Sequence, residues 1–134
     1  QHGFVGRVRA AGARVIAEAV LPAPSTITAG REALRALIPR LGGRSALFCS
    51  SDLLAFGAIV EAQRHAIRVP DQLAVCGFGD FELGAASEPA VTTVTVEGSR
   101  IGCEAAAMIL GRVGELDGPR RIDAPFRILQ RNSS

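Results

Sequence analysis

The chain has 134 residues, of which 48% are hydrophobic and 21% charged, so one domain with a buried core is expected. Its net charge is +2 and no basic cluster is longer than Arg120-Arg121, which argues against a nucleic-acid-binding surface within this chain. Six Phe without Trp or Tyr argue against a stacking platform for single-stranded nucleic acid. No apolar run is long enough for a membrane-spanning helix, so no membrane partner is expected.

The chain begins with Gln1 and carries its single methionine at position 108, so we expect a processed chain or part of a longer protein. It has no basic-then-apolar leader. The three cysteines, Cys49, Cys76 and Cys103, are odd in number and widely spaced, which argues against a disulfide framework or a zinc site. We therefore expect a reducing, cytoplasmic compartment, with no metal and no cofactor.

The first half of the chain alternates helical and strand-like patterns. Residues 3–12 have apolar positions at helical spacing, and residues 15–20 alternate enough for a strand. A capping threonine, Thr26 or Thr28, then begins a helix that Gly42-Gly43 ends. Residues 46–49 form a short apolar strand, and Ser50 or Ser51 begins a long helix that runs through His65.

The second half continues the alternation. Residues 73–78 are predicted as an apolar strand and residues 92–96 as a strand of β-branched residues. Residues 97–113 are predicted as a helix with one apolar stripe, made by Ile101, Ala105, Met108, Ile109 and Val113. Short strands at Ile122 and 126–129 follow, with a hairpin across Ala124-Pro125 as one option.

This order predicts an α/β fold with a parallel sheet and helices on both sides. Ligands of such sheets sit beyond the carboxyl ends of the strands. Two loops qualify, residues 49–52 and 77–82, because each places small polar or acidic groups after a buried strand. Carboxylates and hydroxyls at this edge suit recognition of sugar hydroxyl groups.

Each candidate side chain has a structural alternative. Asp52 either binds a ligand or complements the start of its helix, and Ser51 either contacts a ligand or caps that helix. Asp80 follows two glycines in a loop, and either has a ligand-binding or interdomain role or is structural. The spacing of Gly77 and Gly79 does not match a dinucleotide-binding fingerprint.

Catalysis finds little support in the sequence. His2 lies near the start of the chain and His65 lies late on a polar helix face, where we expect it to be solvated. Neither is next to a strand-end Ser or Cys, and no paired acid and base is evident. We therefore expect a protein that is not an enzyme and has no catalytic residues.

Several strings resemble the LacI/GalR family of bacterial transcriptional regulators. Residues 46–58 (ALFCSSDLLAFGA) resemble its apolar-apolar-x-x-N-D-x-x-A-x-G-A segment, and residues 67–80 (IRVPDQLAVCGFGD) resemble its V-P-x-D-(I/L)-x-V-x-G-F-D-D segment. The remaining matches, in the family's order, are Gly3-Phe4, residues 89–94 (PAVTTV), residues 101–106 (IGCEAA) and residues 131–134 (RNSS). The resemblance covers essentially the whole chain.

The resemblance implies a type I periplasmic-binding-protein-like fold, of which residues 1–134 are the C-terminal part, with its C-terminal lobe only. By this resemblance, we expect the helix-turn-helix and most of the first lobe to lie outside this chain, and operator DNA to be bound only through that N-terminal part. Residues 95–118 pack on the first lobe in this family. Their apolar stripe is therefore expected to be covered by another chain, by swapping or oligomerisation.

The same resemblance implies a small-molecule effector bound by Ser51, Gly79, Asp80 and Phe81. It also implies a homodimer surface on the helix at 53–60 with the loop near 85–88, through Leu53, Leu54, Gly57, Val60 and Ala85. Two positions depart from the family pattern, since Ser51 replaces an Asn and Gly79 replaces an Asp. The string Gly77-Phe78-Gly79-Asp80 is similar to the gluconate-repressor branch, and one carboxylate fewer suits an anionic sugar acid.

We therefore interpret the chain as the effector-binding and dimerisation portion of a sugar-responsive or sugar-acid-responsive repressor. A transport-type sugar-binding protein of the same fold is the alternative, which a leader peptide upstream would support. A small α/β enzyme is a third reading, against which stands the lack of a nucleophile or acid/base arrangement.

Overall fold

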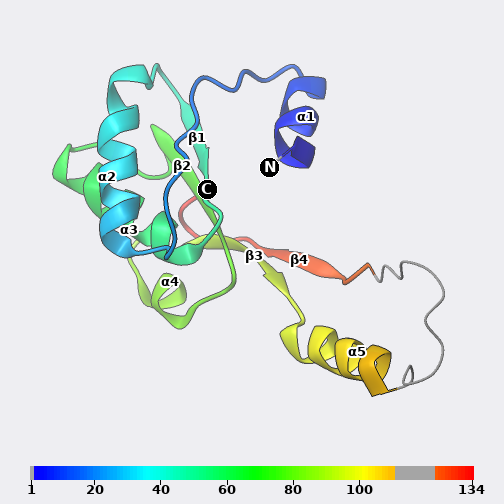
Figure 1. Ribbon diagram of the computed structural model, residues 1–134. Coiled ribbons are helices and arrows are strands. Elements are labelled where there is room, and N and C mark those ends of the chain that lie inside the picture. Colours follow the sequence, from blue (N-terminus) through cyan, green and yellow to red (C-terminus); the bar gives the residue numbers. More distant parts are fainter. Residues whose placement is uncertain (1, 111–122) are drawn as a thin grey trace.

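The computed structural model describes residues 2–110 and 123–134. Helices and strands alternate along most of the chain (Figure 1). In chain order they are α1 (His2–Ala10), α2 (Ile27–Leu37), the 3-10 turn η1 (Ile38–Arg40), β1 (Ser45–Phe48), α3 (Asp52–Arg64), β2 (Leu73–Phe78), α4 (Glu82–Ala86), β3 (Thr92–Val96), α5 (Gly98–Leu110) and β4 (Phe126–Leu129).

One four-stranded sheet organises the chain, in the order β1-β2-β3-β4. β1, β2 and β3 are parallel, with Ser45 opposite Leu73 and Cys76 opposite Thr92. The predicted parallel sheet is confirmed for β1, β2 and β3, whereas β4 runs antiparallel to β3, so the whole sheet is mixed. The ribbon of β3 and β4 leads from the rest of the sheet towards α5 (Figure 1).

The helical layer of α2, α3 and α4 lies on one face of the sheet. α3 packs on β2, and α2 and α4 pack on α3. The core between them is apolar and consists of Leu34, Cys49, Leu54, Ala55, Ala58, Ile59, Ala62, Leu73, Val75 and Val91. Residues in β1 and β2 alternate between this core and the opposite face, as one buried face requires.

The sequence predicts helices on both faces of the sheet, but the face opposite α2, α3 and α4 is more exposed to solvent than that prediction implies. There α1 contributes Phe4, whose ring stacks on Phe48 with centroids 4.7 Å apart. Phe48 remains 37% exposed and Phe78 38% exposed. None of the described helices is both long and apolar enough to cross a bilayer.

Most predicted elements are confirmed, and the bounds of β2 and β3 agree with the prediction. The strand predicted at residues 15–20 is not formed, and this segment lies outside the described sheet, whose strands follow the order β1-β2-β3-β4. The helix predicted to reach Gly42 ends at Leu37, because Pro39 cannot donate to an α-helical ladder. Residues 111–113 and Ile122 lie outside the described residues.

Candidate functional site

The loops after β1 and β2 meet at the carboxyl edge of the sheet. β1 ends at Phe48 and α3 begins after Ser51, while β2 ends at Phe78 and α4 begins after Phe81. Because β1 and β2 are parallel, both loops leave the sheet at the same end. The candidate residues of both loops are therefore brought to one edge, as the sequence predicts.

Asp52 links the elements at this edge through two hydrogen bonds. Its side chain is 1% exposed, and Oδ1 accepts a 2.7 Å hydrogen bond from the hydroxyl of Thr93 on β3. Oδ2 accepts a 2.8 Å bond from the backbone N–H of Phe81 in the other loop. Of the two roles that the sequence leaves open for Asp52, this geometry fits the structural one, since both oxygens bind groups of the protein.

Gly77 is the position on β2 where this carboxylate comes closest to the backbone. A Cβ on Gly77 would collide with Oδ1 of Asp52. A side chain here would therefore push Asp52 away from Thr93 and Phe81. The glycine is needed for space at this point rather than for an unusual backbone angle.

Ser51 caps α3. Its backbone is extended, and its hydroxyl oxygen accepts a 3.2 Å hydrogen bond from the N–H of Leu53. Ser51 is 9% exposed. A serine hydroxyl keeps its own O–H for donation while it accepts a capping bond, so capping leaves a donor for a ligand.

The loop of Gly79, Asp80 and Phe81 has an unusual backbone. Gly79 has φ +120° and Asp80 has φ +59°, both in the left-handed half of conformational space. The N–H of Gly79 donates to the carbonyl of Val94 at 2.9 Å. A Cβ on Gly79 would lie 3.2 Å from the ring of Phe81, so this ring, which is 45% exposed, covers the glycine.

Asp80 is held by a residue from the far end of the chain. Its Oδ1 lies 2.6 Å from Nη2 of Arg131, an ion pair whose side chains are 20% exposed on the arginine and 32% on the aspartate. Nη1 of Arg131 donates to the carbonyl of Val91 at 2.9 Å. Sequence reasoning singled out neither Arg131 nor Thr93, although both lie in strings that carry the family resemblance.

A hollow of about 450 Å³ lies beside this edge, between the segment 14–21 and β1. Phe4, Phe48 and Ser50 are among its lining residues, together with Leu34 and Leu37 of α2. Ser51, Gly79, Asp80 and Phe81 do not line it. The hollow therefore adjoins the first candidate loop through Cys49 and Ser50, but none of the predicted effector contacts lines it.

The cysteines fit a structural interpretation. Cys49 is buried, and burial raises the pKa of its thiol to about 12. Burial also raises the pKa of the Cys76 thiol. Both thiols stay protonated near neutral pH, which makes them poor nucleophiles and poor metal ligands. No cluster of His, Cys, Asp and Glu suited to a metal occurs in residues 2–110 and 123–134.

The residues of the predicted dimer surface differ in how far they are buried. Leu54 and Gly57 are buried, and a Cβ on Gly57 would collide with the carbonyl oxygen of Ile27 on α2. These two residues pack inside the chain and offer no surface to a partner. Leu53 and Val60 are half-buried and Ala85 is exposed, so these three remain available.

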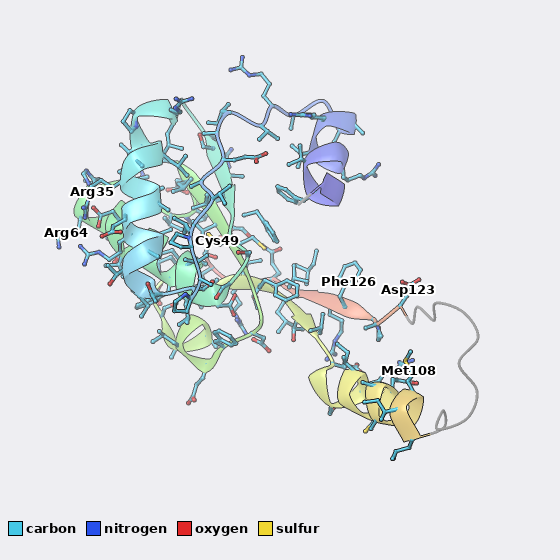
Figure 2. All side chains as sticks on the ribbon, viewed as in Figure 1. Arg35, Cys49, Arg64, Met108, Asp123 and Phe126 are labelled. Carbon is cyan, nitrogen blue, oxygen red and sulfur yellow. The ribbon has the colours of Figure 1, made fainter. Side chains whose placement is uncertain are left out.

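α5 lies apart from the helical layer, beyond the ribbon of β3 and β4 (Figure 1). Met108 and Phe126, labelled in Figure 2, lie at this end of the molecule. On α5, Ile101 is 42% exposed, Ile109 71% and Leu110 79%. Within the described residues, the predicted apolar stripe is therefore largely exposed, with Met108 half-buried, and Val113 lies outside the described residues.

All of the chain, residues 1–134, matches the family described as periplasmic binding protein-like domain, and the chain belongs to this family. One relative is the HTH-type transcriptional repressor CytR of Escherichia coli strain K12, 31% identical over 112 residues. The match covers 84% of this chain but 33% of CytR, so the chain spans about a third of that protein's length.

Solved structures agree with this assignment. The transcription regulator GntR from Chromobacterium violaceum superposes with a TM-score of 0.84 and 36% identity, over 98% of this chain and 49% of that one. The transcriptional regulator CelR, solved as a cellobiose complex, gives a TM-score of 0.85 and 28% identity, over 98% of this chain and 41% of CelR. The matches confirm the resemblance to LacI-family regulators.

Proposed function

We propose that the chain is the effector-binding and dimerisation portion of a transcriptional repressor that responds to a sugar or sugar acid. The observation that carries this proposal is the convergence of the two loops at one sheet edge, where Asp52 holds the second loop against the first. The relatives are transcriptional regulators rather than enzymes, and they favour this proposal over a transport-type sugar-binding protein. Such a regulator works in the cytoplasm, where operator DNA is found.

The proposed effector contacts are Ser51, Gly79, Asp80 and Phe81. Ser51 offers a hydroxyl proton, and the exposed ring of Phe81 offers an apolar surface for a sugar face. Gly79 adds no carboxylate, and the charge of Asp80 is offset by Arg131. This charge balance supports an anionic ligand such as gluconate over a neutral hexose.

In the proposed mechanism, the effector binds between this lobe and a second lobe and stabilises one of two arrangements of the regulator. Its differential affinity for those arrangements shifts the equilibrium between DNA-bound and released states. Residues 95–118 are proposed to cross to the second lobe or to another chain. The uncovered apolar stripe of α5 supports that role.

Calorimetric titration of the full-length protein with gluconate and with glucose tests the proposed ligand class. The matched variants are Gly79→Asp and Gly79→Asn, which impose the same backbone strain and differ in charge. We expect gluconate to bind more tightly than glucose, and the Asp variant to bind gluconate roughly tenfold more weakly than the Asn variant. Tighter binding of glucose by the wild type would contradict the proposal.

A further inference from the structure

The loop 79–81 needs an external restraint, because its backbone leaves the regions that most residues prefer. Asp80 is a non-glycine residue with φ +59°, next to Gly79 with φ +120°. Its N–H makes a long 3.4 Å contact with the hydroxyl of Thr93. On either side of Asp80, the N–H of Gly79 donates to Val94 and the N–H of Phe81 donates to Asp52, so Asp80 itself is the loop residue whose restraint remains to be explained.

Arg131 supplies a restraint at three points. Its N–H donates to the hydroxyl of Thr92 at 2.9 Å, and Nη1 donates to the carbonyl of Val91 at 2.9 Å. Nη2 reaches Oδ1 of Asp80 at 2.6 Å. The planar guanidinium therefore links the start of β3 to the loop after β2 with fixed geometry.

The segment that carries Arg131 is itself anchored in the sheet. Ser133 is fully buried, and its hydroxyl donates to the carbonyl of Val75 at 2.6 Å and accepts from the N–H of Thr92 at 2.8 Å. Its N–H donates to the carbonyl of Ala90 at 3.0 Å, and its carbonyl accepts from Val75 at 2.7 Å. Arg131 thus extends towards the loop from a fixed base.

We infer that Arg131 is a positioning residue, which holds the loop 79–81 in its ligand-facing conformation through the carboxylate of Asp80. Asp80 then acts on the effector through the position of its backbone and of its neighbours, while its carboxylate stays paired with Arg131. The importance of the loop for a ligand rests on the proposed function. The conformation of the loop does not, and it can be measured without ligand.

Hydrogen exchange of the segment 77–82 in the ligand-free, full-length protein tests this role. We expect Arg131→Gln and Asp80→Asn each to accelerate exchange there roughly tenfold, because each breaks the same charged hydrogen bond. The double variant should exchange no faster than either single one, since the two residues act as a pair. Arg131→Lys should protect the segment more than Arg131→Gln does, because lysine keeps the positive charge although it lacks the planar guanidinium with its several donors.

Leu34→Val in the core under α2 is the structural control, and Arg127→Gln on the exposed part of β4 is the charge control. Leu34→Val should lower the melting temperature without selective acceleration of exchange at 77–82, and Arg127→Gln should change neither. If Arg131→Gln instead lowers the melting temperature without selective exchange at 77–82, or the two single effects add, the inference is overturned. If exchange behaves as expected but the wild type binds no gluconate, the proposed ligand class fails and the positioning role stands.

Discussion

Asp52 is the residue on which the geometry of the candidate site depends most. Its carboxyl group is almost completely buried, an arrangement that proteins tolerate only when the polar atoms are hydrogen-bonded. Its partners, Thr93 and Phe81, belong to β3 and to the second loop. One side chain therefore holds together segments that are far apart in the sequence.

Two substitutions at Asp52 test whether stability depends on its hydrogen-bond acceptors or on the full carboxylate. Asp52→Ala leaves the Phe81 N–H and the Thr93 hydroxyl without their acceptor, so we expect a loss of about 2–4 kcal/mol in the free energy of unfolding. Asp52→Asn can still accept from Phe81 and should cost about 1 kcal/mol. Urea denaturation of the full-length protein measures both, with the exposed Asp71→Asn as control. Equal losses for Ala and Asn would contradict this account.

The contact between α2 and α3 contains an ionic cluster around the buried Glu61. Oε1 of Glu61 on α3 accepts a 2.8 Å hydrogen bond from Arg35, and Oε2 accepts a 3.1 Å bond from Arg31. His65, which we expected to be solvated, is half-exposed with Nε2 3.3 Å from Oε1. The hydrogen bond from Arg35 is the main cause that lowers the pKa of Glu61 to about 2, against the opposing effect of burial.

This lowered pKa predicts an acid-dependent contribution to stability. A carboxylate whose pKa is lower in the folded protein stabilises it fully above its unfolded pKa of 4.5, and that contribution is lost as pH falls towards about 2. The difference in unfolding free energy between wild type and Glu61→Gln should therefore shrink as pH falls through this range. Glu32→Gln, at an exposed position on α2, is the control. A difference that does not change with pH would contradict the assignment.

Sequence patterns predicted the elements well where local chemistry decides them. The cap at Ser51 and the β-branched run of β3 are such cases. They predicted elements less well where tertiary contacts decide the structure. The segment 15–20, for example, would form a strand only if it paired with another strand. The roles of Arg131 and Thr93 depend on contacts across many residues of chain, which no local spacing indicates.

At the scale of the whole molecule, we propose two surfaces of the described residues as contacts with other chains. One comprises Leu53 and Val60 on α3 and Ala85 on α4, none of which is fully buried. The other is the stripe of Ile101, Ala105, Met108 and Ile109 on α5. An exposed apolar stripe of this kind on a helix usually marks a contact with another domain or chain.

We expect Val60→Asp to weaken the dimer of the full-length protein more than tenfold, because it places an unpaired charge in an apolar contact. Ala36→Asp introduces the same charge at an exposed position on α2 and is the control. Sedimentation equilibrium measures both dissociation constants. If the two variants associate equally well, the dimer surface lies elsewhere.

The stripe on α5 predicts self-association of the 134-residue chain when it is produced alone. Ile109→Glu should shift it towards monomer, because a charge on the stripe opposes burial against another chain. Arg100→Glu, away from the stripe on the same helix, should leave association unchanged. Light scattering after size-exclusion chromatography gives the masses. A monodisperse wild-type monomer with α5 ordered would contradict this prediction.

The measurement that tests the central claim most directly is hydrogen exchange of the full-length protein with and without saturating gluconate. The account predicts added protection in peptides covering 49–52 and 77–82, where Ser51, Gly79, Asp80 and Phe81 lie. Protection confined to residues 14–21 and β1 would instead place the ligand in the neighbouring hollow. That result, or the absence of any protection, would contradict the proposed effector site.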